Sequence, residues 1–186
     1  MNGRGRWLVV IAVAAIAGVL TGRYVGHVIK MPATSANTPI PAPTLVEGDV
    51  VPADLTLTAL DGRPMPLAAY RGRPLLINVW ASWCGPCVEE MPELAAFASE
   101  QGDNGTQVIG LALDTPEAVG DFLTRVPVHY PIALDTPGPH DASVALGNER
   151  GLLPYTVLID ADGRLVRRKL GPFKAGEIAA WANNGK

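Results

Sequence analysis

The sequence has few cysteines, few aromatic residues and no excess of positive charge. Only 2 of its 186 residues are cysteines, too few for the disulfide framework of a small secreted scaffold and, alone, for a structural zinc site. We therefore expect no metal and no cofactor. Hydrophobic residues make up 48% and charged residues 18%, which excludes a wholly disordered chain. The length suits one globular domain with a short extra segment.

The N-terminal segment is basic, whereas the rest of the chain is acidic. Residues 1–31 contain no acid, so the rest of the chain holds all 18 acidic residues and has a net charge of −7. Because phosphate binding needs clustered lysine and arginine, an acidic body argues against nucleic acid as a partner. We interpret the only basic cluster, residues 167–169, as the solvated side of a strand.

Residues 7–20 form an apolar run that follows Arg4 and Arg6. Positive residues before such a run are typical of an export segment. We predict that residues 1–30 are an N-terminal membrane anchor, with a cleaved signal or a buried helix as alternatives. Either export interpretation places the body outside the cytoplasm, in the periplasm of a bacterium with an inner membrane. The proline-containing residues 31–46 are predicted to be a semi-rigid linker, and residues 47–186 the domain.

The domain pattern predicts an α/β fold with a mixed sheet, because strands and helices alternate early and a hairpin ends the chain. The run 75–80 is nearly all apolar, as in a strand covered on both faces. The other strands are expected at 55–60, 107–113, 130–134, 155–159 and 165–170, and the helices at 86–100, from 116, 140–146 and 174–182. On the long helix we expect Val88, Met91, Leu94 or Ala95, and Ala98 to face the core.

The two cysteines, Cys84 and Cys87, lie where the buried strand 75–80 gives way to the long helix. Amides at a helix N-terminus stabilise an anion, which lowers the pKa of a thiol there below about 8.5. The thiolate is the nucleophile of disulfide exchange, and two intervening residues let the second sulfur reach the first. We therefore predict that Cys84 attacks and Cys87 resolves. Pro86 suits the first helical turn because it lacks an N–H group.

Other uses of a cysteine pair fit less well. Haem attachment needs a histidine directly after the second cysteine, where this chain has Val88. A one-cysteine peroxidase needs a proline and a hydroxyl residue at the places of Ile77 and Ala81. A structural disulfide closing such a small loop stabilises little. Redox catalysis is favoured, with a copper-binding chaperone module or a thiol peroxidase as the remaining alternatives.

Residues 78–87, Asn-Val-Trp-Ala-Ser-Trp-Cys-Gly-Pro-Cys, resemble the active-site segment of thioredoxin-fold proteins. Residues 61–62, 89–94 and 151–160 narrow the resemblance to the TlpA/ResA branch of membrane-tethered thiol–disulfide oxidoreductases, over about residues 47–184. The resemblance implies a thioredoxin-like fold, in which helices flank a central mixed β-sheet. It also implies an N-terminal β-hairpin and a central helix/strand insertion around residues 117–148. Within that insertion we expect residues 135–141 to be an ordinary loop rather than part of a substrate groove.

The resemblance also implies a substrate-binding surface around the cysteines. Pro154 matches the proline that is cis in this fold, which leaves the backbone of Leu153 free to pair with an extended substrate. Trp83 matches the aromatic residue beside the nucleophile and is expected to be partly exposed. Gly85 and Pro86, between the cysteines, complete this surface.

Proton transfer is expected to involve Glu90. Cytoplasmic thioredoxins have a buried aspartate where this chain has Asn78, which cannot titrate. Glu90 matches an acid that the ResA branch uses near its cysteines. We hypothesise that it is partly buried, has a raised pKa and exchanges a proton with Cys87. The alternative is a solvated carboxylate that complements the helix dipole.

These features predict an extracytoplasmic thiol–disulfide oxidoreductase. The Gly-Pro pair between the cysteines matches reducing thioredoxins, whose potentials lie near about −270 mV, so we favour a reductase. The expected substrates are protein disulfides, for example those of apocytochrome c or of copper-site cysteines in oxidase assembly factors. A reductase in an oxidising compartment needs an electron supply. The resemblance implies that a membrane thiol transporter provides it.

Overall fold

The computed structural model describes residues 45–183 of the chain. The predicted anchor, residues 1–30, and most of the predicted linker, residues 31–46, lie outside the described residues. Within residues 45–183, no helix combines the length and the apolar character needed to cross a membrane.

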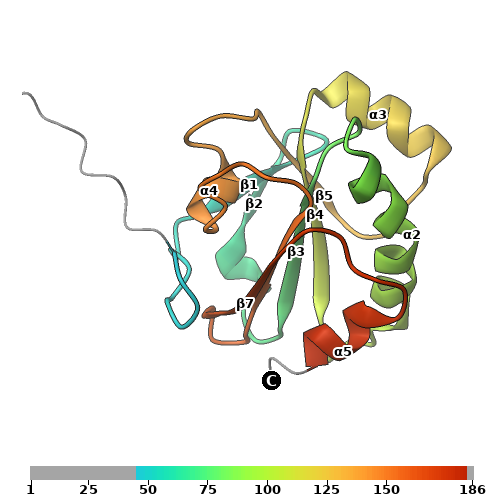
Figure 1. The fold of residues 1–186 in the computed structure, drawn as a ribbon. Helices are drawn as coiled ribbons and strands as arrows, with labels where there is room; N and C mark the ends of the chain where they lie inside the picture. The colour runs from blue at the N-terminus through green and yellow to red at the C-terminus, as the bar shows by residue number, and fades with distance from the viewer. Residues whose placement is uncertain (1–44, 184–186) are drawn as a thin grey trace, which may run out of the picture. The chain divides into compact units, whose positions relative to one another are not determined.

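A seven-stranded mixed sheet forms the centre of the domain, in the order β2-β1-β5-β4-β3-β6-β7 (Figure 1). The central strand β3 (Leu75–Trp80) pairs parallel with β4 (Gln107–Leu113) and antiparallel with β6 (Tyr155–Ile159). All six residues of β3 are buried, as its apolar sequence predicts. The other strands are β1 (Thr56–Ala59), β2 (Pro64–Pro66), β5 (Ile132–Asp135) and β7 (Leu165–Leu170).

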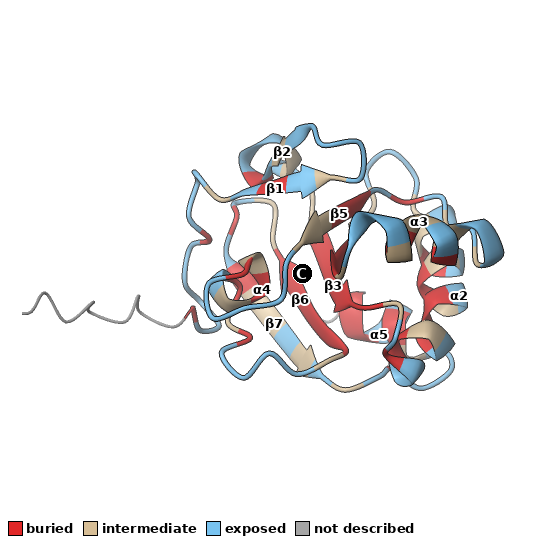
Figure 2. Cartoon of the chain, turned by 90° about the horizontal axis from the view of Figure 1, so that it is seen from above, coloured by how far each residue is buried: buried red, intermediate tan, exposed pale blue. Residues whose placement is uncertain are grey.

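Helices cover both faces of the sheet (Figure 2). On one face lie α2 (Gly85–Glu100), α3 (Pro116–Arg125) and α5 (Glu177–Asn183), packed over Leu76 and Trp80 of β3. The other face carries Ile77 and Val79 of the same strand, because successive side chains of a strand point to opposite faces. That face is covered by the 3-10 helix η1 (Leu67–Tyr70) and the short α4 (Ala142–Ala145).

The predicted fold class is confirmed, but several elements are shorter than predicted. The short helix begins at Ala142 because the side chain of Asp141 caps it, accepting hydrogen bonds from the N–H groups of Ser143 and Val144. The last helix begins at Glu177 because Gly176, before it, has a φ of 77°, which no helix residue adopts. The strand expected at 130–134 begins at Ile132, after Pro131, which lacks an N–H group.

The predicted core-facing side of α2 is confirmed, but it was incomplete. Met91 and Leu94 are buried, and Val88, Ala95 and Ala98 are partly buried and pack against the core cluster. The remaining buried positions of α2, which the predicted face did not include, are Cys87, Glu90 and Phe97. The side of the helix that faces the sheet therefore also carries a carboxyl group, that of Glu90.

The interpretation of the basic cluster at residues 167–169 as the solvated side of a strand is only partly confirmed: the cluster lies on β7 and Arg168 is exposed, but the other two basic side chains contact α5. Arg167 donates a hydrogen bond to the carbonyl of Trp181 and lies 5.2 Å from the centre of its ring. Lys169 forms an ion pair with Glu177 at 3.1 Å. Because α5 packs against this side of β7, two of the three basic side chains are used to hold that helix.

Candidate active site

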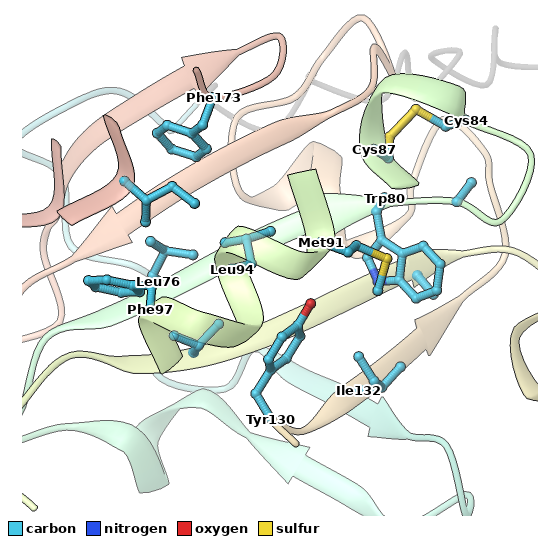
Figure 3. Packing of buried hydrophobic residues seen from close by; sticks show 14 of the residues in the cluster. Leu76, Trp80, Cys84, Cys87, Met91, Leu94, Phe97, Tyr130, Ile132 and Phe173 are labelled. Carbon is cyan, nitrogen blue, oxygen red and sulfur yellow. A yellow bond between two sulfur atoms is a disulfide. The ribbon is translucent and has the colours of Figure 1, made fainter. Parts of the chain in front are cut away.

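The two cysteines lie at the N-terminus of α2, directly after the loop 81–83 that follows β3. They form a disulfide, with Cα atoms 5.3 Å apart (Figure 3). Cys84 is the N-cap residue, and its carbonyl accepts hydrogen bonds from the N–H groups of Cys87 and Val88. Cys84 retains 7% of its surface and Cys87 none, so a partner approaches this pair from the Cys84 side.

The electrostatics of this helix end favour an anion on the Cys84 sulfur after reduction. The first turn of α2 contains no acidic residue, and a proline occupies its start. The N–H groups of a first helical turn and the helix dipole therefore act on Cys84, and no carboxylate of that turn opposes them. This is the arrangement that activates a thiol for disulfide exchange.

The predicted substrate-binding residues gather around Cys84. Trp83 is 69% exposed, and Gly85 and Pro86 are exposed beside it. The Leu153–Pro154 peptide bond is cis, as predicted. Within residues 45–183, no hydrogen bond uses the backbone of Leu153.

Register brings the proline loop to the cysteines. Tyr155 of β6 pairs with Val79 of β3, so Pro154 lies at the end of the sheet from which the chain enters α2. Leu153 packs against the core cluster that contains both cysteines. Residues far apart in the sequence therefore meet at one edge of the sheet.

Glu90 is buried, with 4% of its surface exposed, and is not a solvated carboxylate. One oxygen accepts a hydrogen bond from Asn78 Nδ2 at 2.8 Å and the other from the N–H of Phe173 at 2.9 Å. Burial raises the pKa of Glu90, although these two hydrogen bonds and the charge of Lys169 oppose the shift. Glu90 follows Cys87 by one helical turn, so the two side chains are neighbours on α2.

Sequence reasoning missed the groups that hold Glu90. Asn78 also donates to Thr156 Oγ1 at 3.0 Å, which fixes its amide between strand β6 and the carboxyl group. Tyr130 is buried nearby, and burial together with the charge of Glu90 raises its pKa. Thr156, Tyr130 and Phe173 are distant from the cysteine motif in sequence, so no local pattern marks them.

Asp114 is a second residue that the sequence analysis did not identify. Its Oδ2 accepts hydrogen bonds from the N–H of Ser82 at 3.0 Å and from Ser82 Oγ at 2.6 Å. Burial alone raises the pKa of Asp114, but the hydrogen bonds from Ser82 and Thr115 outweigh it and lower the pKa. Asp114 therefore fixes the loop 81–83 that carries Trp83 to Cys84. The sequence feature that could have identified Asp114 is its position, because it is an acidic residue directly after the buried strand β4.

Residues 135–141 complete β5 and then form a loop before α4, as expected. Pro137, Gly138 and Pro139 line a hollow that Trp83 and Leu153 also line. The loop turns back to the cysteine edge because the carboxylate of Asp135 accepts a hydrogen bond from the N–H of Ala142 at 2.8 Å. Across residues 45–183, no group of three or more histidine, cysteine or acidic residues is placed to hold a metal ion.

Comparison with known proteins agrees with this geometry. A family model described as Redoxin matches residues 35–183. The chain belongs to the Redoxin family. Within it, the chain is 31% identical over 126 residues to the thiol-disulfide oxidoreductase ResA of Geobacillus thermodenitrificans, covering 67% of this chain and 70% of that protein. The chain is also 29% identical over 119 residues to ResA of Bacillus cereus. This match covers 63% of this chain and 66% of the relative, so the chain spans just under two thirds of the length of that relative.

Solved structures show the same fold. A putative thiol:disulfide interchange protein DsbE from Chlorobium tepidum matches with a TM-score of 0.65 and 28% identity, over 74% of this chain and 94% of that one. A thioredoxin-related protein from Neisseria meningitidis matches with a TM-score of 0.63 and 30% identity, over 69% and 97%. The described part of this Redoxin-family chain therefore has a thioredoxin-like fold and is similar to ResA-type thiol–disulfide oxidoreductases.

Proposed function

We propose that the whole protein is an extracytoplasmic reductase of protein disulfides, working through the Cys84–Cys87 pair. The observation that carries the proposal is the placement of this pair at the N-terminus of α2, with exposed surface on Cys84 alone. The names of the ResA relatives support thiol–disulfide exchange as the reaction. The Gly-Pro pair between the cysteines supports reduction as its direction.

The reaction begins with the reduced enzyme. The Cys84 thiolate attacks one sulfur of the substrate disulfide, forming a mixed disulfide and releasing the other substrate sulfur as a thiolate. Cys87 then loses its proton and attacks Cys84, which releases the second substrate thiolate. Two electrons pass to the substrate, and the enzyme is left with the Cys84–Cys87 disulfide seen in the structure.

Glu90 is suited to manage the proton of Cys87. Cys87 has no exposed surface, so water does not take its proton directly. Glu90 is the buried titratable group one turn further along the helix, and its raised pKa brings it closer to that of a thiol. We assign Glu90 as the acceptor of this proton during resolution and as its donor when the enzyme is reduced again.

The location and the partners extend the same proposal. In this proposal residues 1–30 anchor the protein to the inner membrane, residues 31–46 are a linker, and the domain from residue 47 lies on the periplasmic side. In the alternative, residues 1–30 are cleaved and the domain is free in the periplasm. A membrane thiol-transfer protein supplies two electrons by reducing the Cys84–Cys87 disulfide. Suitable clients are oxidised cysteine pairs of apocytochrome c or of copper-site assembly factors.

Insulin reduction in the presence of dithiothreitol tests the proposed activity. The wild-type protein is expected to accelerate insulin precipitation, and Cys84→Ser to abolish the acceleration. Cys87→Ala is expected to accumulate mixed disulfides through Cys84, which mass spectrometry identifies. The proposal is wrong if the wild-type protein does not accelerate the reaction. Stoichiometric copper binding or peroxide consumption in its place would favour a copper chaperone or a peroxidase.

A further inference from the structure

A second hollow, of about 350 Å³, lies at the end of the sheet opposite to the cysteines, and we call it the distal hollow. Its lining comes from the C-terminal part of α2, the start of β4 and residues 129–131, which precede β5. The cysteines follow the other end of β3, whose six residues span about 20 Å. The mechanism above therefore makes no use of this hollow.

The charged groups that line the distal hollow are basic. Its lining contains Arg73 and His129 and no acidic residue. Within residues 45–183, no carboxylate forms an ion pair with Arg73, and the only two ion pairs there involve Arg63 and Lys169. Glu100 and Asp103, in the adjoining segment, are exposed. The distal hollow thus presents a positive charge that no acid of the described chain neutralises by contact.

Neutral oxygen atoms hold the guanidinium of Arg73 in place. Its Nη2 donates a hydrogen bond to Gln107 Oε1 at 3.0 Å, and its Nη1 donates to the carbonyl of Asp103. Gln107 in turn donates to the carbonyl of Tyr70 at 2.7 Å. A glutamate at position 107 would neutralise the guanidinium, whereas the amide orients it and leaves its charge unbalanced. A guanidinium has five N–H donors, so further donors remain for a ligand.

The rest of the lining is mostly apolar or aromatic. Pockets of about 300–1,000 Å³ with apolar walls and a few polar groups are typical of small-molecule sites. Thr106, which also lines the distal hollow, is 2% exposed, and its Oγ1 has no hydrogen-bond partner within residues 45–183. A buried hydroxyl in this state is destabilising and is available to a ligand at the wall. The apolar and aromatic lining residues are Tyr70, Ala95, Ala98, Val108, Tyr130 and Pro131.

The end of α2 limits the charge that the distal hollow accepts. The helix ends at this hollow, and a helix C-terminus carries about half a negative charge. Gln101 covers part of it, because its Nε2 donates to the carbonyl of Phe97 at 3.1 Å and its N–H to that of Ala98 at 3.3 Å. The full charge of Arg73 exceeds the remainder by a small margin. A singly charged carboxylate therefore fits better than a doubly charged phosphate.

We propose that the distal hollow binds a small organic carboxylate, with the carboxylate on Arg73 and an apolar body against Tyr70 and Tyr130. Hydrogen bonds between a guanidinium and a carboxylate are charge-assisted and among the strongest in proteins. A cavity of about 150 Å³ accepts benzene, so this hollow has room for a body of two fused rings. The proposal does not depend on the proposed function, because the site lies at the other end of the sheet from Cys84.

Calorimetric titration of the full chain with 2-naphthoate tests the proposal. We expect saturable binding at one site, and binding of 2-naphthamide, which has the same shape without the charge, to be at least tenfold weaker. Arg73→Gln should weaken the binding of 2-naphthoate at least tenfold, about 1.4 kcal/mol, and leave that of the amide unchanged. Arg125→Gln is the matched control, because Arg125 is exposed and does not line the distal hollow.

A second pair of variants tests the place of the apolar body. Ala98→Phe fills the distal hollow and is expected to abolish binding of 2-naphthoate. Ala96→Phe is its control, because Ala96 is exposed on the same helix and does not line the hollow. Thermal unfolding of each variant without ligand shows that it is folded, and either pair alone suffices if one variant does not fold.

Three results would overturn the proposal. They are no saturable binding of 2-naphthoate, equal affinity for the acid and the amide, and affinity that survives both Arg73→Gln and Ala98→Phe. Acetate bound as tightly as 2-naphthoate would show a surface contact with an anion and no site for an organic body, which also contradicts it. Insulin reduction, measured in parallel, is expected to be the same in all four variants and with or without 2-naphthoate, so the proposed function is judged separately.

Discussion

Glu90 is a carboxyl group placed under the helix that carries both cysteines. Its two oxygens accept hydrogen bonds from Asn78 of β3 and from the backbone of Phe173, after β7. These donors stabilise the ionised form, but loss of hydration outweighs them and the pKa is raised. The group therefore keeps its proton to a higher pH in the folded protein than in the unfolded chain.

Glu90→Gln tests this shift through stability. Above its ordinary pKa of 4.5, the unfolded chain releases the Glu90 proton while the folded protein still holds it. The wild-type free energy of unfolding therefore falls as pH rises from 4.5 through the raised pKa, and it levels off above that pKa. Glu90→Gln should lack this fall, as measured by urea unfolding between pH 4 and pH 8. Parallel curves for the two proteins would show that the pKa of Glu90 is not raised.

For single residues, the sequence predicted the reactive groups better than it predicted the residues that contact them. The spacing and context of Cys84 and Cys87 predicted their pairing and their position at the helix N-terminus. The resemblance identified Glu90 as the proton-transfer candidate among the three acidic residues of that stretch of the sequence. Its hydrogen-bond donor Phe173 is 83 residues away in sequence, and only the packing of β7 and α5 brings the two together.

Strand β4 has a glycine, Gly110, where large side chains of the core pack against the strand. A Cβ atom at Gly110 would lie 2.8 Å from Ile132 Cδ1, 3.0 Å from Trp80 Nε1 and 3.1 Å from Tyr130 Cε2. The absent side chain lets the rings of Trp80 and Tyr130 pack against the strand, beneath the cysteine helix (Figure 3). The glycine is therefore set by close packing rather than by a turn.

Gly110→Ala is expected to destabilise the protein by about 1–3 kcal/mol, because well-packed neighbours must move to admit the methyl group. Gly120→Ala is the matched control: Gly120 lies within α3 with nothing within 4 Å of its added Cβ. There the same change should stabilise by about 0.5–1 kcal/mol, since alanine favours a helix. Denaturant midpoints measure both. A Gly110→Ala protein as stable as wild type would contradict the packing described.

Elements with a strong local pattern were predicted well, and those set by tertiary contacts were not. The apolar runs at 75–80 and 107–113 and the Thr115-Pro116 helix start were found where expected. The burial of Phe97 on α2 was missed because it depends on which side chains fit the sheet. The hollow beside the loop at residues 135–141 was not predicted, because Asp135 and Asp141 position this loop by accepting hydrogen bonds from backbone groups, and the sequence does not reveal those contacts.

The architecture of the domain places the chemistry at one edge of the sheet. The loop after β3, the loop before β6 and the segment after β5 all meet there, around Cys84. The resemblance predicted a thioredoxin-like fold with a central mixed sheet flanked by helices, and the sheet and the Redoxin match agree with it. The location of the domain relative to a membrane depends on residues 1–30 and remains a prediction.

Membrane fractionation tests that prediction. The full chain, expressed in a bacterium with an inner membrane, is expected in the membrane fraction, with its domain open to protease added to spheroplasts. A chain that lacks residues 1–30 should be found in the soluble fraction and should still reduce insulin. Recovery of the intact full chain in the soluble fraction would contradict an uncleaved anchor, and recovery of a shortened chain would indicate a cleaved signal.

Alkylation of the reduced protein by iodoacetamide across pH measures the central claim directly. We expect Cys84 to react first, with a pKa clearly below the value of about 8.5 for a free thiol, while Cys87 stays protected. Mass spectrometry of the modified peptide assigns the site. A Cys84 that reacts slowly with an ordinary thiol pKa, or a Cys87 that reacts first, would contradict the account.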